Sequence, residues 1–538
     1  MKQLAAFRSL RGLGGARPRS LDWCATLLLL ALLAAPSIWM LSVIPPLWRD
    51  IDAYVQVTQP PGAQTILQYG PLYCLLARIP IYLGYAIECL RVGDPVPSVA
   101  FLLHPTLTDS GVFTLLLSQH VALCWSAFYL ISAASRFFLV RLLLAGVWVT
   151  NPLFYTFAHC VGSETLSMIF LLLLGATGIK IISHRRKVPG REWLLFGLLL
   201  WLSILTRHLN ALLAALMPVT FLLLSAHRVT LAAFARSKLV RRGQRLRARE
   251  DLRKTAVTLA IGLSCIVLAN ISSRGLCAAV HIPYRFQAGF AFLWRLEFLA
   301  RLPSETANEF LDRMARDVSA PDVQKVISQL REAIHETTAW EATAFMRETQ
   351  AALLAPDMKL QEESMSVLNR TVVAFLWPPR DLFVNAVETD FARARLTTIP
   401  DVGRSLFVHT IFYYSYRDVM PGYAPLITFR DKTENDILAH YKRHSYFHRW
   451  KQFSYNAFWC LWFALILILA LVTKKSSYEM AVVHYGLAAT LVGVAMILAN
   501  CLLNEFQPRY TLPMWELTIV SLWLVLGRSM DRWIGRKL

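Results

Sequence analysis

The chain has 538 residues, of which 56% are hydrophobic, and this proportion is too high for a soluble multi-domain protein. The apolar residues gather in runs near the ~20 residues that cross a bilayer. The formal net charge of +20 does not indicate nucleic acid, because bases crowd short segments while residues 276–452 hold 21 acids and 21 bases. The sequence therefore predicts an all-α, multi-pass integral membrane protein with no nucleic acid among its partners.

The basic segments orient the chain, because Lys and Arg collect in cytoplasmic loops. An acid-free basic stretch precedes the first apolar run, 24–44, which is longer than a signal-peptide core and predicts an uncleaved anchor. Both termini are then expected in the cytoplasm. About ten transmembrane helices are predicted, at 24–44, 111–134, 137–157, 164–183, 192–206, 209–226, 255–275, 454–473, 478–501 and 510–527.

The apolar stretch 66–90 is interrupted by Pro71, Arg78, Pro80 and Glu88. As a full span it would place the basic loops 183–192 and 227–254 outside, against the positive-inside rule. We therefore predict one or two helices lying along the membrane surface.

Three regions follow from this topology. Residues 1–275 form an N-terminal transmembrane module whose first outer loop is 45–110, and 454–538 form a C-terminal one. Residues 276–453 between them are expected to be a large helical extracytoplasmic loop. The basic segment 227–254 is predicted to be a cytoplasmic loop beside anionic headgroups.

Some polar residues directly adjoin apolar spans. All of them fall on the predicted outer face, at the ends of spans or in short turns. They are Asp50, Asp52, His159, Glu164, Arg207, His208, Asn504, Glu505, Gln507 and Arg509. A charge at the membrane centre costs roughly 2.5–3.5 kcal/mol on the mildest scale, whereas the water edge avoids this cost. A carboxylate can serve as a general base and arginine suits a phosphate, so the set fits transfer of a group from a lipid phosphate.

Each residue also has a purely structural interpretation. Asp50 and Asp52 could be solvated loop acids, and Glu164 could complement a helix dipole. Arg207 and Arg509 could be interfacial anchors that reach toward lipid headgroups.

Several short motifs carry a resemblance, in the order Asp50-Ile51-Asp52, Gly70-Pro71-Leu72-Tyr73, Ser163-Glu164, Leu205-Thr206-Arg207 and Gln507-Pro508-Arg509-Tyr510. Together they resemble the glycosyltransferase-C superfamily, GT-C. The closer likeness is to the polyprenyl-phosphate-sugar-dependent branch of protein O-mannosyltransferases and the lipid A aminoarabinose transferase. The chain departs from that pattern at His208, where the family usually has proline, and residues 276–453 match no known pattern.

The resemblance implies a GT-C-like fold and inverting transfer of a hexosyl or pentosyl group from a polyprenyl-phosphate sugar. Asp50 or Asp52 would be the base, with Asp50 favoured because it lies nearer the end of the span. Arg207 and Arg509 would contact the phosphate, and Glu164 would orient a hydroxyl. The remaining expected substrate contacts are Tyr73, His159, Gln507 and Tyr510.

The resemblance leaves other features open. Some relatives bind a divalent metal, Mg or Mn. The acceptor is a protein, a glycolipid or a polysaccharide. A bacterial inner membrane is favoured, with the endoplasmic reticulum as the alternative.

Two other classes of membrane protein are alternatives to a glycosyltransferase of this branch. An O-antigen ligase or polymerase would use diphosphate-linked donors, place its working Arg and His residues in the late loop and need no acid pair. A transporter or flippase for a lipid-linked substrate would need polar or broken helices near mid-membrane.

Overall fold

The computed structural model describes most of the chain. The described residues are 19–43, 46–48, 51–58, 66, 70–184, 188–235, 237–282, 284, 291–292, 295–335, 358–377, 380–397, 477–503 and 508–537. The predicted span 454–473 and the predicted site residues Asp50 and Gln507 lie outside them.

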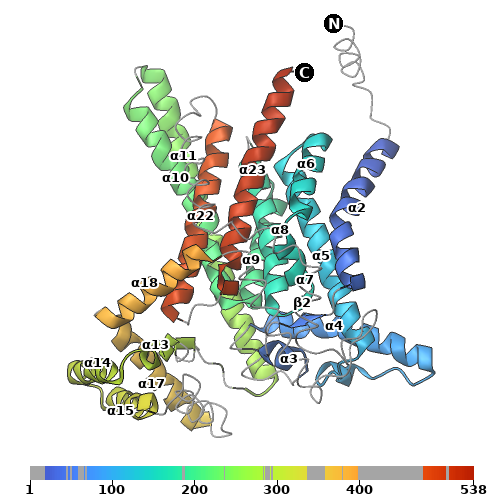
Figure 1. The fold of residues 1–538 in the computed structure, drawn as a ribbon. Coiled ribbons are helices and arrows are strands. Elements are labelled where there is room, and N and C mark those ends of the chain that lie inside the picture. The colour runs from blue at the N-terminus through green and yellow to red at the C-terminus, as the bar shows by residue number, and fades with distance from the viewer. Residues whose placement is uncertain are drawn as a thin grey trace.

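Helices account for nearly all of the described secondary structure (Figure 1). A two-residue parallel bridge joins β1 (Leu47–Trp48) to β2 (Cys160–Val161), and it forms the sheet of the described part. The all-α prediction is therefore confirmed.

Eight described helices are long and apolar enough to cross a membrane. Seven of them correspond to predicted spans. They are Trp23–Ser42 in α2 (Arg19–Val43), Asp109–Ala134 (α5), Ser163–Ser183 (α8), His208–Ala233 (η3, His208–Ala215, with α10, Leu216–Ala233), Lys238–Ala279 (α11), Ala481–Leu503 in α22 (Ser477–Leu503) and Arg509–Asp531 in η5 (Pro508–Thr511) and α23 (Leu512–Lys537). The chain is thus a multi-pass membrane protein. The predicted span 192–206 forms a 17-residue helix, α9 (Gly190–Thr206).

The predicted single span 137–157 is wrong. The structure has two short helices there, α6 (Phe138–Val149) and α7 (Pro152–Ala158). Asn151 caps the second helix by accepting a hydrogen bond from the backbone N–H of Leu153 at 3.0 Å. Pro152 at the first helical position lacks an N–H, so it starts a new helix rather than continuing the old one.

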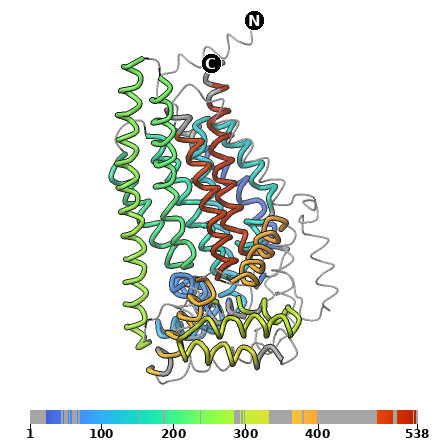
Figure 2. Tube along the Cα trace, turned by 90° about the vertical axis from the view of Figure 1, so that its left-hand side faces the viewer, coloured from blue at the N-terminus to red at the C-terminus, as the bar shows by residue number. Residues whose placement is uncertain are grey.

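The stretch predicted to lie on the membrane surface is one 22-residue helix, α4 (Pro71–Val92), which is the eighth helix of spanning length. It runs across the ends of the bundle helices, below them in both views (Figures 1 and 2). Its outward side chains Ile79, Leu83 and Ile87 are exposed. Their spacing of four residues puts them on one helix face, as expected for a helix at a lipid surface.

Buried Arg78 ties α4 to its neighbours. Its Nη1 donates to the carbonyls of Leu102 and Leu103, both at 2.9 Å, and its Nη2 donates to the carbonyl of Gln56 in α3 (Ile51–Thr58) at 3.1 Å. The two Nη1 hydrogen bonds link α4 to the last residue of η2 (Val99–Leu102) and to the residue that follows it. The first outer loop is therefore held together as a packed unit.

The basic segment 227–254, predicted as a cytoplasmic loop between two spans, is mostly helical. α10 runs to Ala233, and α11 starts at Lys238 and continues for 42 residues to Ala279. We call the side of the bundle where α10 and α11 connect the hairpin side, and the opposite side, where α3, α4 and β2 lie, the loop side (Figure 1). α2 starts and α23 ends on the hairpin side, in agreement with predicted termini on one face.

The described part of 276–453 is helical and lies on the loop side (Figure 1). It comprises α13 (Glu297–Ala300), α14 (Ser304–Asp317), α15 (Pro321–His335), α17 (Met358–Leu376) and α18 (Asp381–Leu396). Its core is aromatic, with Phe292, Phe375 and Phe383 in mutual ring contact. Arg295 and Asp390 form a buried ion pair beside these rings, and α18 packs against α22.

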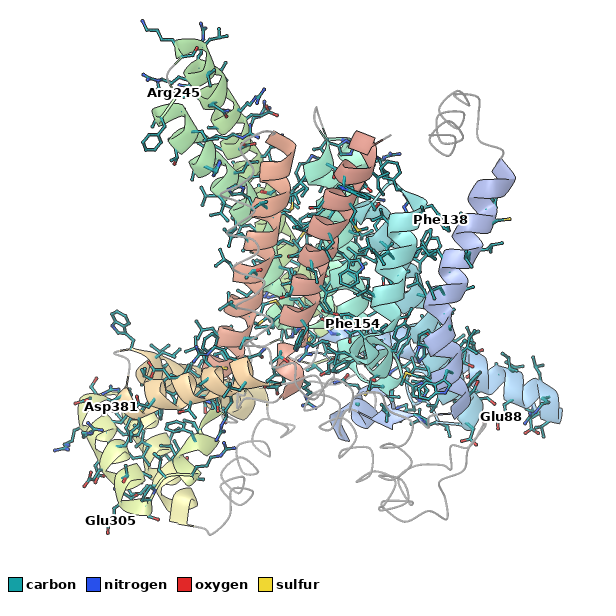
Figure 3. The ribbon with its side chains drawn as sticks, turned by 45° about the horizontal axis from the view of Figure 1, so that its top comes forward. Glu88, Phe138, Phe154, Arg245, Glu305 and Asp381 are labelled. Carbon is teal, nitrogen blue, oxygen red and sulfur yellow. The ribbon has the colours of Figure 1, made fainter. Side chains whose placement is uncertain are left out.

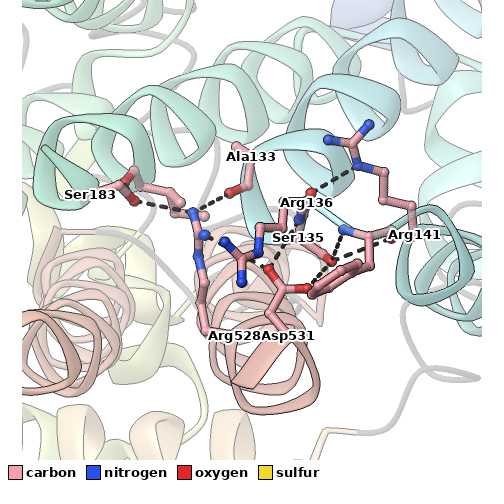
Figure 4. Close-up of polar contacts among 9 residues, drawn as sticks. Ala133, Ser135, Arg136, Arg141, Ser183, Arg528 and Asp531 are labelled. Carbon is pink, nitrogen blue, oxygen red and sulfur yellow. Dashed lines mark hydrogen bonds and ion pairs between the residues drawn. The ribbon is translucent and has the colours of Figure 1, made fainter. Parts of the chain in front are cut away.

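On the hairpin side, Asp531 joins α23 to the turn between α5 and α6 (Figure 4). Its carboxylate accepts hydrogen bonds from the Ser135 hydroxyl and, at 3.0 Å, from the Arg136 backbone N–H, both in the turn between α5 and α6. Arg528, one turn earlier, donates to the Ala133 carbonyl at 2.9 Å and to the Ser183 hydroxyl at 3.2 Å. The last helix therefore closes the bundle against α5 and α8.

We expect Asp531→Ala to lower the apparent melting temperature of the detergent-purified protein. It leaves two donors without their acceptor in a buried turn, at a cost of about 2 kcal/mol. The matched control is Asp312→Ala, whose ion pair with Arg331 is solvent-exposed and contributes under about 1 kcal/mol. Equal shifts for the two variants would contradict the fastening role of Asp531.

Candidate functional site

A short turn between α7 and α8 positions Glu164. Gln119 of α5 donates its amide to the carbonyls of Ala158 and Cys160, at 2.9 and 3.1 Å. The hydroxyl of Tyr73 accepts a hydrogen bond from the Gly162 backbone N–H at 2.8 Å. These contacts satisfy three backbone groups of the turn and hold Glu164, the second residue of α8, in a defined place.

Glu164 lies between two arginines that come from distant parts of the chain. Its Oε1 is 3.3 Å from Nη1 of Arg207 and 4.0 Å from Nε of Arg509. The Glu164 side chain is 2% exposed and the Arg509 side chain 9%, whereas 21% of the Arg207 side chain is exposed. Arg207 is thus the member of this group that reaches solvent most.

Arg207 is held at the break between α9 and η3. Its backbone N–H donates to the Ser203 carbonyl at 3.1 Å, and its carbonyl accepts from the Asn210 N–H at 2.9 Å. The Asn210 amide donates in turn to the Ser167 hydroxyl of α8 at 2.8 Å. The arginine therefore occupies a rigid corner that is tied to the same helix as Glu164.

Gly70 lies directly against this corner. A Cβ placed on Gly70 would come within 2.6 Å of the Thr206 carbonyl oxygen and 2.7 Å of the Leu205 one, and its φ is +91°. Only glycine combines that backbone angle with so close an approach. The Gly70-Pro71 and Thr206-Arg207 motifs are therefore in contact.

The structure thus gathers five of the residues predicted from sequence. Tyr73 supports the turn before Glu164, and Glu164 contacts both Arg207 and Arg509. Tyr510 is 8% exposed, and its ring lies 5.7 Å from the Arg509 guanidinium carbon.

The acid motif enters the same region through the backbone. β1 pairs Leu47 with Cys160 and Trp48 with Val161, in the turn just before Glu164. Asp52 follows as the second residue of α3, whose buried Ala53 and Val57 pack into a cluster with Tyr73 and Val161. The Asp52 side chain and all of Asp50 lie outside the described residues.

His159 faces into the helix bundle. Its Nδ1 is 3.1 Å from Nε2 of His120, and His120 Nδ1 is 3.0 Å from the Ser37 hydroxyl. All three side chains are buried. This buried chain of hydrogen bonds explains His159 as a structural group, and its predicted contact with substrate stays a prediction.

Sequence reasoning missed Glu516. This residue of α23 is 1% exposed, its Oε1 has no hydrogen-bond partner among the described residues, and it interacts electrostatically with Arg207. The signal was available, because an acid inside an apolar span is costly and rare. Gln119 and His120 carried the same kind of signal within the span 111–134.

Glu164 is the carboxylate that the structure places against both guanidiniums, Arg207 and Arg509. A buried guanidinium needs such a partner, and the N–H groups of a guanidinium suit phosphate oxygens. The described residues contain no group of three or more His, Cys, Asp or Glu side chains placed to hold a metal ion. The sequence left metal dependence open, and the side chains of Asp50 and Asp52 lie outside the described residues.

Comparison with protein-family models gives no match, and comparison with curated proteins gives none either. Among solved structures, the chain is similar to the archaeal oligosaccharyltransferase AglB from Archaeoglobus fulgidus, in complex with an inhibitory peptide and a dolichol-phosphate. The TM-score is 0.38 at 12% sequence identity, over 95% of this chain and 52% of that one, so the chain spans about half the length of AglB. So distant a likeness leaves the chemistry to be inferred from the residues of this site.

We expect Glu164→Ala to destabilise the protein by about 3 kcal/mol, because it leaves two largely buried arginines without their shared carboxylate. Adding Arg207→Ala should cost less than the sum of the single changes, with a coupling of roughly 1–2 kcal/mol in a double-mutant cycle of unfolding free energies. Glu309→Ala, at an exposed acid of α14, is the control. Strictly additive costs for Glu164 and Arg207 would show that their proximity has no energetic consequence.

Gly70→Ala and Gly93→Ala form a second matched pair. Both glycines have a left-handed φ, +91° and +86°, but nothing lies within 4 Å of a Cβ on Gly93. Gly93→Ala should cost only the conformational penalty, about 1–2 kcal/mol. Gly70→Ala should lower the melting temperature much further, because its methyl group meets backbone that cannot move independently; similar shifts would argue against the tight corner.

Proposed function

We propose that this protein is a membrane glycosyltransferase of the GT-C type. It would transfer a sugar from a polyprenyl-phosphate donor to an acceptor on the extracytoplasmic face, with inversion at the anomeric carbon. The observation that carries this proposal is the meeting of Arg207 and Arg509 on Glu164 at the loop-side ends of the bundle helices, beside the segment that leads into the acid motif.

The arginines suit the leaving group. Bond cleavage between the anomeric carbon and the phosphate oxygen leaves negative charge on a polyprenyl phosphate, and a guanidinium offers a permanent charge and paired donors to such oxygens. Arg207 would make the main contact because its side chain is the more exposed of the two.

A carboxylate would activate the acceptor. Asp50 or Asp52 would take the proton of the acceptor hydroxyl while its oxygen forms the new bond to the anomeric carbon, a contribution typically worth 10²–10⁴ in rate. If Mg²⁺ or Mn²⁺ takes part, these two aspartates offer the oxygen ligands that such ions prefer, and the ion would neutralise charge on the donor phosphate.

Glu164 takes a positioning role in this proposal. The motif resemblance implies that Glu164 orients a hydroxyl. In the structure, however, the Glu164 Oε1 contacts both guanidiniums and its side chain is almost fully buried. We therefore assign it to holding the two arginines at one spacing.

Release of polyprenyl phosphate from a panel of polyprenyl-phosphate sugars tests the reaction directly. The wild-type protein should release it from at least one donor, and Asp50→Asn with Asp52→Asn should slow release by about 10²-fold or more. Arg207→Lys should also slow it, because lysine keeps the charge but loses the paired donors. Repeating the assay with EDTA decides the metal question.

The exposed acids Asp312 and Asp317 provide the control, changed together to Asn, and this variant should keep wild-type turnover. Turnover only with diphosphate-linked donors, unaffected by loss of Asp50 and Asp52, would transfer the protein to the ligase class. Movement of an intact lipid-linked sugar across vesicles without any release would favour the transporter alternative.

A further inference from the structure

The helical hairpin on the hairpin side is a packed structure. The Ser225 hydroxyl of α10 donates to the Ala248 carbonyl of α11 at 3.1 Å. Arg228 and Asp251 form an ion pair at 3.0 Å, with side chains 9% and 4% exposed. The two helices therefore keep a fixed face outward for most of their length.

This hairpin extends past the membrane-spanning part of the bundle. A helix of 42 residues is about 63 Å long, twice the ~30 Å hydrocarbon thickness. A run of exposed apolar side chains that suits lipid extends from Val257, near the middle of the helix, to Ile271. The first half, with Arg245 near the tip, projects beyond neighbouring helices (Figures 1 and 3).

The projecting half carries strong, uncompensated positive charge. Between Lys238 and Lys254 there are eight Lys and Arg residues against Glu250 and Asp251. Both acids are already engaged, Asp251 with Arg228 and Glu250 with Lys254 at 3.0 Å. Among the described residues, no carboxylate lies within ion-pair distance of the exposed Arg242, Arg249 or Arg253.

These three arginines share the outward face. Arg253 is four residues before the exposed apolar Val257, and Arg249 is four residues before Arg253, so they follow one line along the helix. Leu246 and Leu239, which are 58% and 83% exposed, continue this face toward the tip. The face thus alternates guanidinium groups with bare apolar side chains, starting at the edge of the apolar span.

That alternation identifies the chemistry of a partner. Arginines just beyond a membrane-spanning segment can reach phosphate oxygens while their stems and the neighbouring leucines contact acyl chains. A nucleic acid would satisfy the charges, but its phosphate backbone offers the leucines no apolar contact. We propose that the outward face of α11 next to the apolar span, at Arg249 and Arg253, binds anionic phospholipid headgroups of the leaflet on the hairpin side.

Binding of individual lipids to the full-length, detergent-purified protein tests this proposal by native mass spectrometry. Phosphatidylglycerol should bind more tightly than phosphatidylcholine, and this preference should weaken as salt is raised. The double change Arg249→Gln and Arg253→Gln should lower phosphatidylglycerol affinity at least about tenfold, since each basic residue near an anionic surface contributes to the attraction.

The matched control removes the same charge on the loop side, by Arg301→Gln and Arg316→Gln, both at exposed positions. It should keep the preference for phosphatidylglycerol. The proposal fails if wild type binds both lipids equally, or if the α11 variant retains the preference. It also fails if the wild-type face binds a single-stranded oligonucleotide more tightly than phosphatidylglycerol at physiological salt. Melting temperatures of both variants in lipid-free detergent check that each is folded.

Discussion

The cost of placing charge beside a membrane interior shapes the loop side of this protein. Four ionisable side chains, Glu164, Arg207, Arg509 and Glu516, lie buried or nearly so where apolar helices end. Isolated, each would carry a desolvation penalty of several kcal/mol, and their mutual attraction and hydrogen bonds must offset it. The three helix starts or breaks that supply them, at α8, α9–η3 and η5–α23, are therefore held to one another.

Much of the surrounding architecture preserves that arrangement. Gln119 and Tyr73 satisfy the turn that presents Glu164, and Asn210 ties the Arg207 corner to α8. The first outer loop reaches the same turn through the β1–β2 bridge and rests on it through Gly70. A site built this way is pre-organised, so its charges need little rearrangement to meet a ligand, which is how electrostatic stabilisation becomes effective. Its stability and its proposed chemistry thus depend on the same contacts.

Sequence reasoning reached most of the membrane topology because hydropathy and loop charge act over whole segments. It failed where a single residue decided the local outcome. Pro152 splits the predicted span 137–157, since it cannot donate the backbone hydrogen bond that a continuous helix needs. The segment 227–254 was predicted as a cytoplasmic loop between two spans, and the structure adds that most of it forms a helical hairpin in which Arg228 pairs with Asp251.

The sequence by itself determined that this is a multi-pass membrane protein, that polar residues collect at the ends of the apolar segments, and the order of the motifs along the chain. These follow from composition and from period and charge within short windows. Only the tertiary structure decided that Glu164 contacts both Arg207 and Arg509, that His159 joins His120 in the bundle core, and that Glu516 belongs beside Arg207. The physical reason is that these side chains come from different helices. Their distances depend on how each helix is rotated and packed against the others, which no single segment encodes.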